Sequence, residues 1–204
     1  MADTGLRRSI AAVAGCLLAL AFLAPPARAA EARAPEPTVE QYDAQVAALL
    51  KKLSDDDLWT APDRSAELAA VLAAAARVAS LKLLPPLIKH IGYEAPPNPN
   101  YLGKRRPGQL NPALAVITRI GAPAIAALVE GIEHAPKTDN AAHLDADAGC
   151  MVLALYEIYN RGGYGVELTR ERIILALSAT TDPQQKANLQ AALDLPILKV
   201  QTKD

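Results

Sequence analysis

The residues best suited to chemistry form a polar cluster in the second half of the chain. Two histidines and three aspartates lie close together there: His134, Asp139, His143, Asp145 and Asp147. Imidazoles and carboxylates at such spacing could bind a divalent cation. An EF-hand loop beginning at Asp145 would need glycine and glutamate where the chain has Cys150 and Tyr156. The spacing therefore favours an interhelical loop whose aspartates cap the next helix, and we predict no metal site.

Cys150 is a second residue with reactive potential. A helix N-terminus lowers the pKa of a thiol and favours the nucleophilic thiolate, but no histidine follows Cys150 to serve as its base. The chain also lacks the G-x-S-x-G, H-E-x-x-H, P-loop and G-x-G-x-x-G motifs. We therefore expect Cys150 to be a small apolar core residue, and we predict no catalytic residue and no cofactor.

A long connection between two helical segments is the strongest candidate for binding. Residues 92–110 read GYEAPPNPNYLGKRRPGQL, and connections of this length are usually functional or disordered. The segment is rich in tyrosine and arginine, which dominate binding hot spots. We predict that four of its residues contact a partner protein: Tyr93, Tyr101, Arg105 and Arg106. The open alternative is a solvated spacer between repeats.

The composition limits the classes of protein to consider. The chain has 204 residues, of which 51% are hydrophobic and 21% charged, with a formal net charge of −1. So many apolar residues with so little net charge exclude an intrinsically disordered chain. The charge balance offers no general attraction to phosphates, so we predict no nucleic-acid partner. Two cysteines exclude a disulfide-stapled miniprotein.

Residues 1–29 have the anatomy of a signal peptide. Arg7 and Arg8 precede an apolar run over residues 10–24, and Ala-Arg-Ala at 27–29 provides a cleavage site. The run is shorter than the roughly 20 residues of a spanning helix. We predict cleavage after Ala29, export to the periplasm or the extracellular space, and a flexible leader over residues 30–37.

A lipid anchor is the alternative for this segment. Residues 13–16, Val-Ala-Gly-Cys, resemble a bacterial lipobox, which would make Cys16 a lipidated N-terminus and the protein membrane-anchored. The apolar run continues beyond Cys16 and is short before it, which favours ordinary cleavage.

Residues 38–204 show helical spacing of apolar residues and no sustained period-two alternation. Thr38 and Gln41 predict a capping box for a first helix, followed by a loop to about Asp63. Later helices are expected to start at Asn111, near Asp145, at Thr169 and at Asp182. We predict an all-α domain in which Trp59 packs in the core and His90 ends a helix.

Two pairs of helices recur about forty residues apart. The second helices match at an offset of 41 and the first helices at 42, which aligns Leu72 with Leu114 and Arg77 with Arg119. A proline stands in or before the first turn of each second helix, at 85–86 and 123. A period near forty with two helices per unit is typical of HEAT and armadillo arrays.

Residues 114–132, LAVITRIGAPAIAALVEGI, resemble a HEAT-type repeat. The similarity rests on the Ile-Gly pair that closes the first helix, the proline that follows, and the apolar spacing of the second helix. Residues 71–91 are similar without the glycine. The resemblance implies a short α-solenoid of antiparallel helical hairpins over residues 38–204. The alternative is an irregular helical bundle whose alanine-rich hairpins match by coincidence.

The function that this resemblance implies is an exported, non-enzymatic protein–protein interaction or scaffold module, because stacked hairpins offer grooves and loops to partners. A homodimer that caps the exposed ends is compatible with so few repeats. One alternative is a small-ligand-binding or lyase-like protein, with a pocket lined by His134, His143 and the nearby aspartates. Another is a structural envelope lipoprotein anchored through Cys16.

Overall fold

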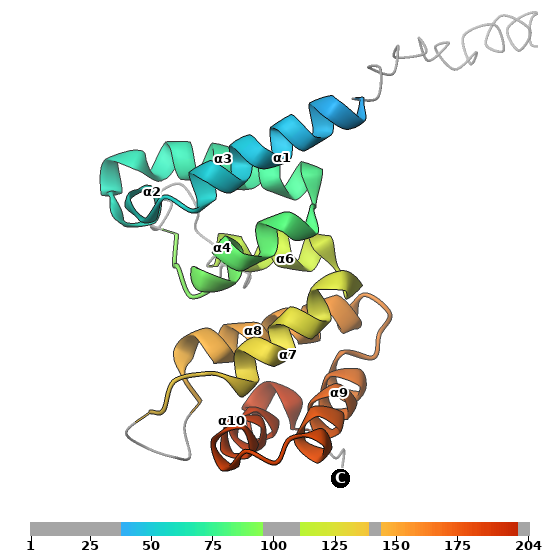
Figure 1. The fold of residues 1–204 in the computed structure, drawn as a ribbon. Helices are drawn as coiled ribbons and strands as arrows, with labels where there is room; N and C mark the ends of the chain where they lie inside the picture. Colours follow the sequence, from blue (N-terminus) through green and yellow to red (C-terminus); the bar gives the residue numbers. More distant parts are fainter. Residues whose placement is uncertain (1–37, 96–110, 139–143, 200–204) are drawn as a thin grey trace, which may run out of the picture. The chain divides into compact units, whose positions relative to one another are not determined.

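The protein is described by a computed structural model over residues 38–95, 111–138 and 144–199. The regular secondary structure of these residues is entirely helical, with no strand among them (Figure 1). They belong to one compact unit that begins at Thr38. The predicted all-α fold class is therefore confirmed. The predicted signal peptide, lipobox and leader lie outside the described residues.

Helix α1 (Val39–Leu53) begins with the predicted capping box. The backbone N–H of Gln41 donates to Thr38 Oγ1 at 3.3 Å, and the N–H of Thr38 donates to Gln41 Oε1 at 3.0 Å. These two bonds satisfy donors that have no partner inside the helix.

The expected loop after α1 is instead a short helix, α2 (Asp56–Thr60), followed by a 3₁₀ turn, η1 (Pro62–Arg64). Asp55 caps α2 by accepting the N–H of Asp57 at 3.1 Å. Sequence spacing missed α2 because five residues are too few to show a helical period. The helix matters for the site because it carries Trp59.

Two helix–turn–helix units follow. The first consists of α3 (Ser65–Val78), the 3₁₀ turn η2 (Leu81–Leu83) and α4 (Leu84–Lys89). The second consists of α6 (Pro112–Ile120), the 3₁₀ turn η3 (Ala122–Ala124) and α7 (Ile125–Glu133). The first helix of each ends on a residue with positive φ, Ala79 at +47° and Gly121 at +79°. These two residues are 42 positions apart and reverse the chain at equivalent points.

Burial follows the same offsets. Leu72 and Leu114 are both buried on the first helices, and Leu87 and Leu128 are both fully buried on the second. Asn111 differs from expectation, because its side chain makes no capping hydrogen bond to α6 and is buried instead. Pro112 takes the first helical position, where its missing N–H costs nothing.

Three longer helices complete the described chain: α8 (Ala146–Asn160), α9 (Gly165–Ala179) and α10 (Pro183–Leu193), followed by a 3₁₀ turn, η4 (Pro196–Leu198). The predicted caps are confirmed for α8 and α10. Asp145 accepts from the N–H of Asp147 at 3.0 Å, and Asp182 accepts from that of Gln184 at 2.8 Å.

The predicted cap at Thr169 is wrong. Helix α9 already begins at Gly165, and Thr169 is fully buried inside it. Gly165 lies so close to α8 that a Cβ there would come within 2.7 Å of the Tyr156 ring. The glycine therefore permits the close approach of the two helices.

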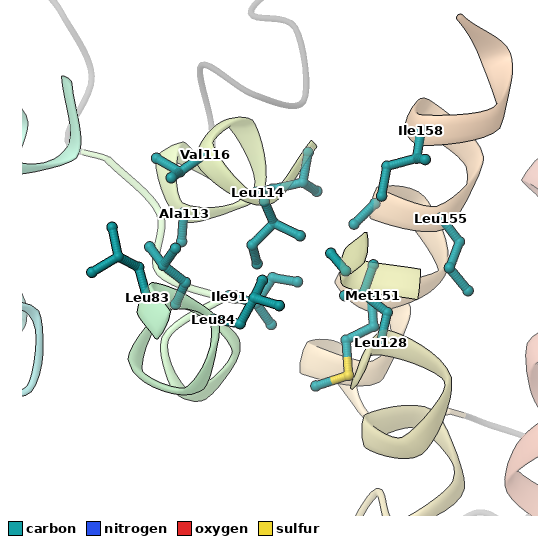
Figure 2. Packing of buried hydrophobic residues seen from close by; sticks show 14 of the residues in the cluster. Leu83, Leu84, Ile91, Ala113, Leu114, Val116, Leu128, Met151, Leu155 and Ile158 are labelled. Carbon is teal, nitrogen blue, oxygen red and sulfur yellow. The ribbon is translucent and has the colours of Figure 1, made fainter. Parts of the chain in front are cut away.

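The helices pack in a regular succession. Helix α3 contacts α1 and α6, α6 contacts α4 and α8, and α7 contacts α4, α8 and α10. In Figure 1 the chain runs in one direction along α3 and α6 and in the opposite direction along α4 and α7. Figure 2 shows the resulting core, with leucine and isoleucine side chains from α4, α6, α7 and α8 directed toward one another.

The buried side chains of the described residues are almost all aliphatic, and Trp59 is the one aromatic among them, as predicted. No single helix in this part of the chain has the length and apolarity to cross a membrane.

Candidate functional site

A groove with a volume of about 460 Å³ lies between α3 and α6. Its α3 side carries a row of small residues, Ala66, Ala69, Ala73 and Ala76, and its α6 side carries Ala115 and Val116. The described residues that line it include no carboxylate, imidazole, thiol or amine. Only Ser65 and Tyr93 contribute polar side chains. The groove is therefore suited to apolar contact rather than proton transfer.

The sequence of α3 explains how the groove forms. No polar residue occurs between Leu68 and Ala76. The leucines and the valine of this stretch are buried in the core, whereas Ala69 and Ala73, and Ala66 one turn before them, are exposed. A surface helix usually carries polar residues on its outer face. Alanines there leave a shallow apolar surface because their side chains are short.

Tyr93 is fixed at one wall of the groove by an aromatic cluster. Its ring packs edge-on against Trp59, with centroids 5.6 Å apart, and its backbone N–H donates to the carbonyl of His90 at 3.0 Å. Trp59 is itself anchored, because its Nε1–H donates to the carbonyl of Leu53 at 2.9 Å. The half-buried Tyr93 is thus held by two elements, α2 and the turn after α4.

Asp56 ties the same cluster together at the surface. Its carboxylate accepts from Lys89 Nζ at 2.6 and 2.7 Å and lies 3.1 Å from His90 Nε2. The hydrogen bond from Lys89, then the one from His90, lowers the pKa of Asp56 below its usual value. His90 ends α4, as predicted, and stacks on Trp59. The prediction that Trp59 is a core residue is also confirmed.

Asp147 lies against the backbone of Gly92, where a Cβ would collide with its Oδ1. Burial raises the pKa of the Asp147 carboxyl, and the negative charge of Asp145 raises it further. The turn after α4 and the start of α8 therefore meet at a point where a side chain at position 92 would force the Asp147 carboxylate to move.

Cys150 does not have the environment of a nucleophile. Burial, followed by the charge of Asp147, raises the pKa of its thiol. The side chain is half-buried and packs against the core. Burial, and then the local carboxylates, therefore favour the protonated thiol over the nucleophilic thiolate.

The polar cluster of the sequence is not brought together in the described residues. His134 Nδ1 donates to the backbone carbonyl of Glu130 at 2.9 Å, and His134 Nε2 lies 3.3 Å from Gln185 Nε2. Asp145 serves as the cap of α8. Within the described ranges, no group of three histidine, cysteine, aspartate or glutamate side chains could hold a metal ion. Asp139 and His143 lie outside those ranges.

Of the four predicted partner contacts, the structure places Tyr93 at the groove. Tyr101, Arg105 and Arg106 fall outside the described residues. Sequence reasoning missed the groove itself, although one signal was present: α3 is apolar on all sides over its central turns. A helix of that kind is normally covered on every face.

Comparisons with known proteins gave no match to any family model, curated protein or solved structure.

Proposed function

We propose that this protein is a non-enzymatic interaction module whose groove between α3 and α6 binds an apolar segment of another protein. The observation that carries the proposal is the aliphatic lining of the groove, together with the exposure of Ala66, Ala69 and Ala73 on α3. Removal of such exposed apolar surface from water by a partner lowers the free energy of the complex. Tyr93, a residue type enriched at binding hot spots, stands at its wall.

We also infer a short solenoid of HEAT-like hairpins as the scaffold. Support comes from the two equivalent units, and from successive packing of α3 on α6 and α6 on α8 in one layer, with α4 on α7 and α7 on α10 in the other. Long grooves between successive helices are a general property of such stacks. The irregular bundle stays the alternative for the C-terminal part, because α8 leads into α9 without the 3₁₀ turn of the earlier units.

Site-specific photocrosslinking in the producing cell tests the proposed function. A photoreactive phenylalanine analogue placed at Ala73, in the groove, should crosslink to one protein species. The matched control is the same analogue at Ala70, which is exposed on the same helix outside the groove. Equal crosslinking from both positions, or none from either, would reject the groove as the contact surface.

The predicted loop contacts form a second part of this proposal. Replacing Arg105 and Arg106 by alanine should weaken the crosslink formed from position 73, because arginine side chains are frequent hot spots. An unchanged crosslink yield would remove these two residues, and with them the basic run, from the contact surface.

A small apolar ligand is the second candidate occupant, favoured by the size of the groove, which lies within the usual range for ligand pockets. The neutral apolar fluorophore N-phenyl-1-naphthylamine distinguishes the two cases. Stoichiometric, saturable binding that Ala73→Trp abolishes would favour a ligand-binding protein. Absence of such binding alongside a specific crosslink would favour the protein partner.

Export, lipidation and self-association are also proposals at this point. An intact mass equal to that of an unmodified chain beginning at Ala30 would support a signal peptide and exclude the lipid anchor at Cys16. Helix α9 exposes Leu168, Ile174 and Leu175, so a homodimer would use this face. Sedimentation of Leu175→Glu beside the wild type tests it: a dimer that persists in the variant does not use α9.

A further inference from the structure

A second hollow lies between α7 and α9, away from the helices that form the groove of the proposed function. Its volume is about 460 Å³, which is within the range of small-ligand sites. Aliphatic residues make up most of its lining: Ala126, Val129, Leu175, Ala176 and Ala179. Leu175 is 52% exposed, so the α9 side of the hollow presents apolar surface to solvent.

Three charged residues also line this α7–α9 hollow. Glu130 and Glu133 belong to α7, and Arg172 belongs to α9. None of the three forms an ion pair with any residue that the structure describes. The hollow therefore contains unpaired charge of both signs. In ligand sites, a few charged groups within an apolar lining fix the orientation of the ligand.

Arg172 has hydrogen-bond donors without acceptors. Its Nε is buried and has no partner among the described residues. Its two terminal nitrogens form no hydrogen bond with a described residue either, and they are not enclosed. An arginine can present its terminal N–H groups to both oxygens of one carboxylate. Arg172 is thus able to bind a carboxylate that enters the hollow.

Glu130 and Glu133 occupy an unfavourable place in α7. They lie in its last turn, and that turn contains no basic residue. The negative end of the helix dipole disfavours carboxylates at this position and favours cations. Residues three positions apart are neighbours on the surface of a helix. A cation bound to the two carboxylates would therefore offset the cost of placing them there.

The two signs of charge belong to opposite ends of the hollow. Its lining covers residues 126–133 of α7 and 172–179 of α9. The two helices run in the same general direction (Figure 1), so Arg172 belongs to the end near Ala126, and Glu133 belongs to the other end. Each wall covers two helical turns, or about 10 Å. An extended peptide of about three residues has the same length.

We propose that the α7–α9 hollow binds a short aliphatic peptide, about three residues long, in its zwitterionic form. The terminal carboxylate of the peptide pairs with Arg172, its terminal ammonium lies between Glu130 and Glu133, and its side chains contact the aliphatic lining. Charge complementarity identifies this class of ligand. A simple anion would meet two glutamates and a simple cation would meet the arginine, whereas a zwitterion of this length has an opposite charge at each end.

Four forms of the tripeptide alanyl-leucyl-alanine test the proposal by isothermal titration calorimetry with the purified protein. The four forms are the free peptide, the N-acetylated peptide, the C-amidated peptide and the peptide capped at both ends. Acetylation removes the ammonium, and amidation removes the carboxylate. The side chains stay the same, so differences in affinity report the terminal charges alone.

We expect each cap to weaken binding about three- to tenfold, because each removes one charge pair. Arg172→Gln should make the free and C-amidated peptides bind equally while keeping the effect of acetylation. Glu130→Gln combined with Glu133→Gln should remove the effect of acetylation and keep that of amidation. The matched control is Glu171→Gln, which is exposed on α9 outside the lining and should change neither effect. An unchanged affinity for the doubly capped peptide shows that a variant keeps the hollow intact.

Equal affinities of all four forms for the wild type would overturn the proposal. A preference that persists in the variant designed to remove it would do the same. Absence of binding by every form at millimolar concentration would also overturn it and would leave the hollow to water. In that case, a dimer that Arg172→Gln dissociates would assign the hollow to a second copy of the chain. None of these outcomes bears on the groove between α3 and α6, which is tested separately.

Discussion

The indole of Trp59 stacks on the imidazole of His90, with ring centroids 4.5 Å apart and planes inclined by 12°. This contact fastens α2 to the end of α4 and, through the edge-on packing of Tyr93 on the same indole, fixes one wall of the groove. Trp59, on the short helix α2, thus holds Tyr93 in place at the groove between α3 and α6.

Removing the indole should therefore be costly. Trp59→Ala should lower the free energy of unfolding by about 3–5 kcal/mol, since the side chain is buried. Trp59→Phe keeps an aromatic ring but leaves the carbonyl of Leu53 without its donor, so we expect a loss of about 1–3 kcal/mol. Urea unfolding measures both values. A Trp59→Phe variant as stable as the wild type would show that the hydrogen bond contributes nothing.

The contact between Gly92 and Asp147 predicts a coupled pair of substitutions. A methyl group at position 92 would displace the Asp147 carboxylate, so Gly92→Ala should cost about 1 kcal/mol or more. In an Asp147→Ala background the same change should be close to neutral, because the obstructing group is gone. A double-mutant cycle measured by urea unfolding gives the coupling. Additive effects would argue against this contact.

The pKa of Asp147 predicts a pH-dependent effect on stability. Because burial raises this pKa in the folded state, the carboxyl loses its proton more readily in the unfolded chain. Stability contributed by the protonated form is fully present below the ordinary pKa of aspartate and is lost as pH rises through the folded-state value. Asp147→Asn should accordingly raise the melting temperature at neutral pH.

The same variant provides its own control at acid pH. Below the ordinary aspartate pKa both side chains are uncharged, so the melting temperatures of Asp147→Asn and the wild type should converge. A stabilisation that is equal at acid and neutral pH would assign the effect to packing instead of charge.

Cys150 should react slowly with alkylating agents. Its thiol pKa is raised by burial and by neighbouring carboxylates, so the thiolate that attacks iodoacetamide is scarce at neutral pH. We expect the native protein to be alkylated at least about tenfold more slowly than the unfolded chain, measured by intact mass over time. Similar rates would indicate a reactive thiol and reopen a chemical role for it.

Much of the helical framework was predictable from local signals. The caps at Thr38, Asp145 and Asp182 are read from residue types alone, because a cap depends on a few neighbouring positions. The offsets of 41 and 42 likewise predicted which residues take equivalent buried places in the two helix–turn–helix units, such as Leu72 and Leu114.

The site was less predictable because it depends on packing between distant segments. Nothing local relates Trp59 to His90, or Gly92 to Asp147; each pair meets only when α2, α4 and α8 assemble. The wrong start predicted at Thr169 has the same origin. Helix α9 begins at Gly165, where the missing side chain permits a tertiary contact with the Tyr156 ring.

The affinity of one labelled, leucine-rich helical peptide of about fourteen residues for two tryptophan variants, measured by fluorescence anisotropy, tests the central claim most directly. That claim is that the groove between α3 and α6 is the binding surface. Ala73→Trp fills the groove with an indole, whereas Ala70→Trp places the same ring on the same helix outside it. We predict that Ala73→Trp abolishes binding and that Ala70→Trp retains the wild-type affinity. Equal affinities in the two variants would contradict the claim.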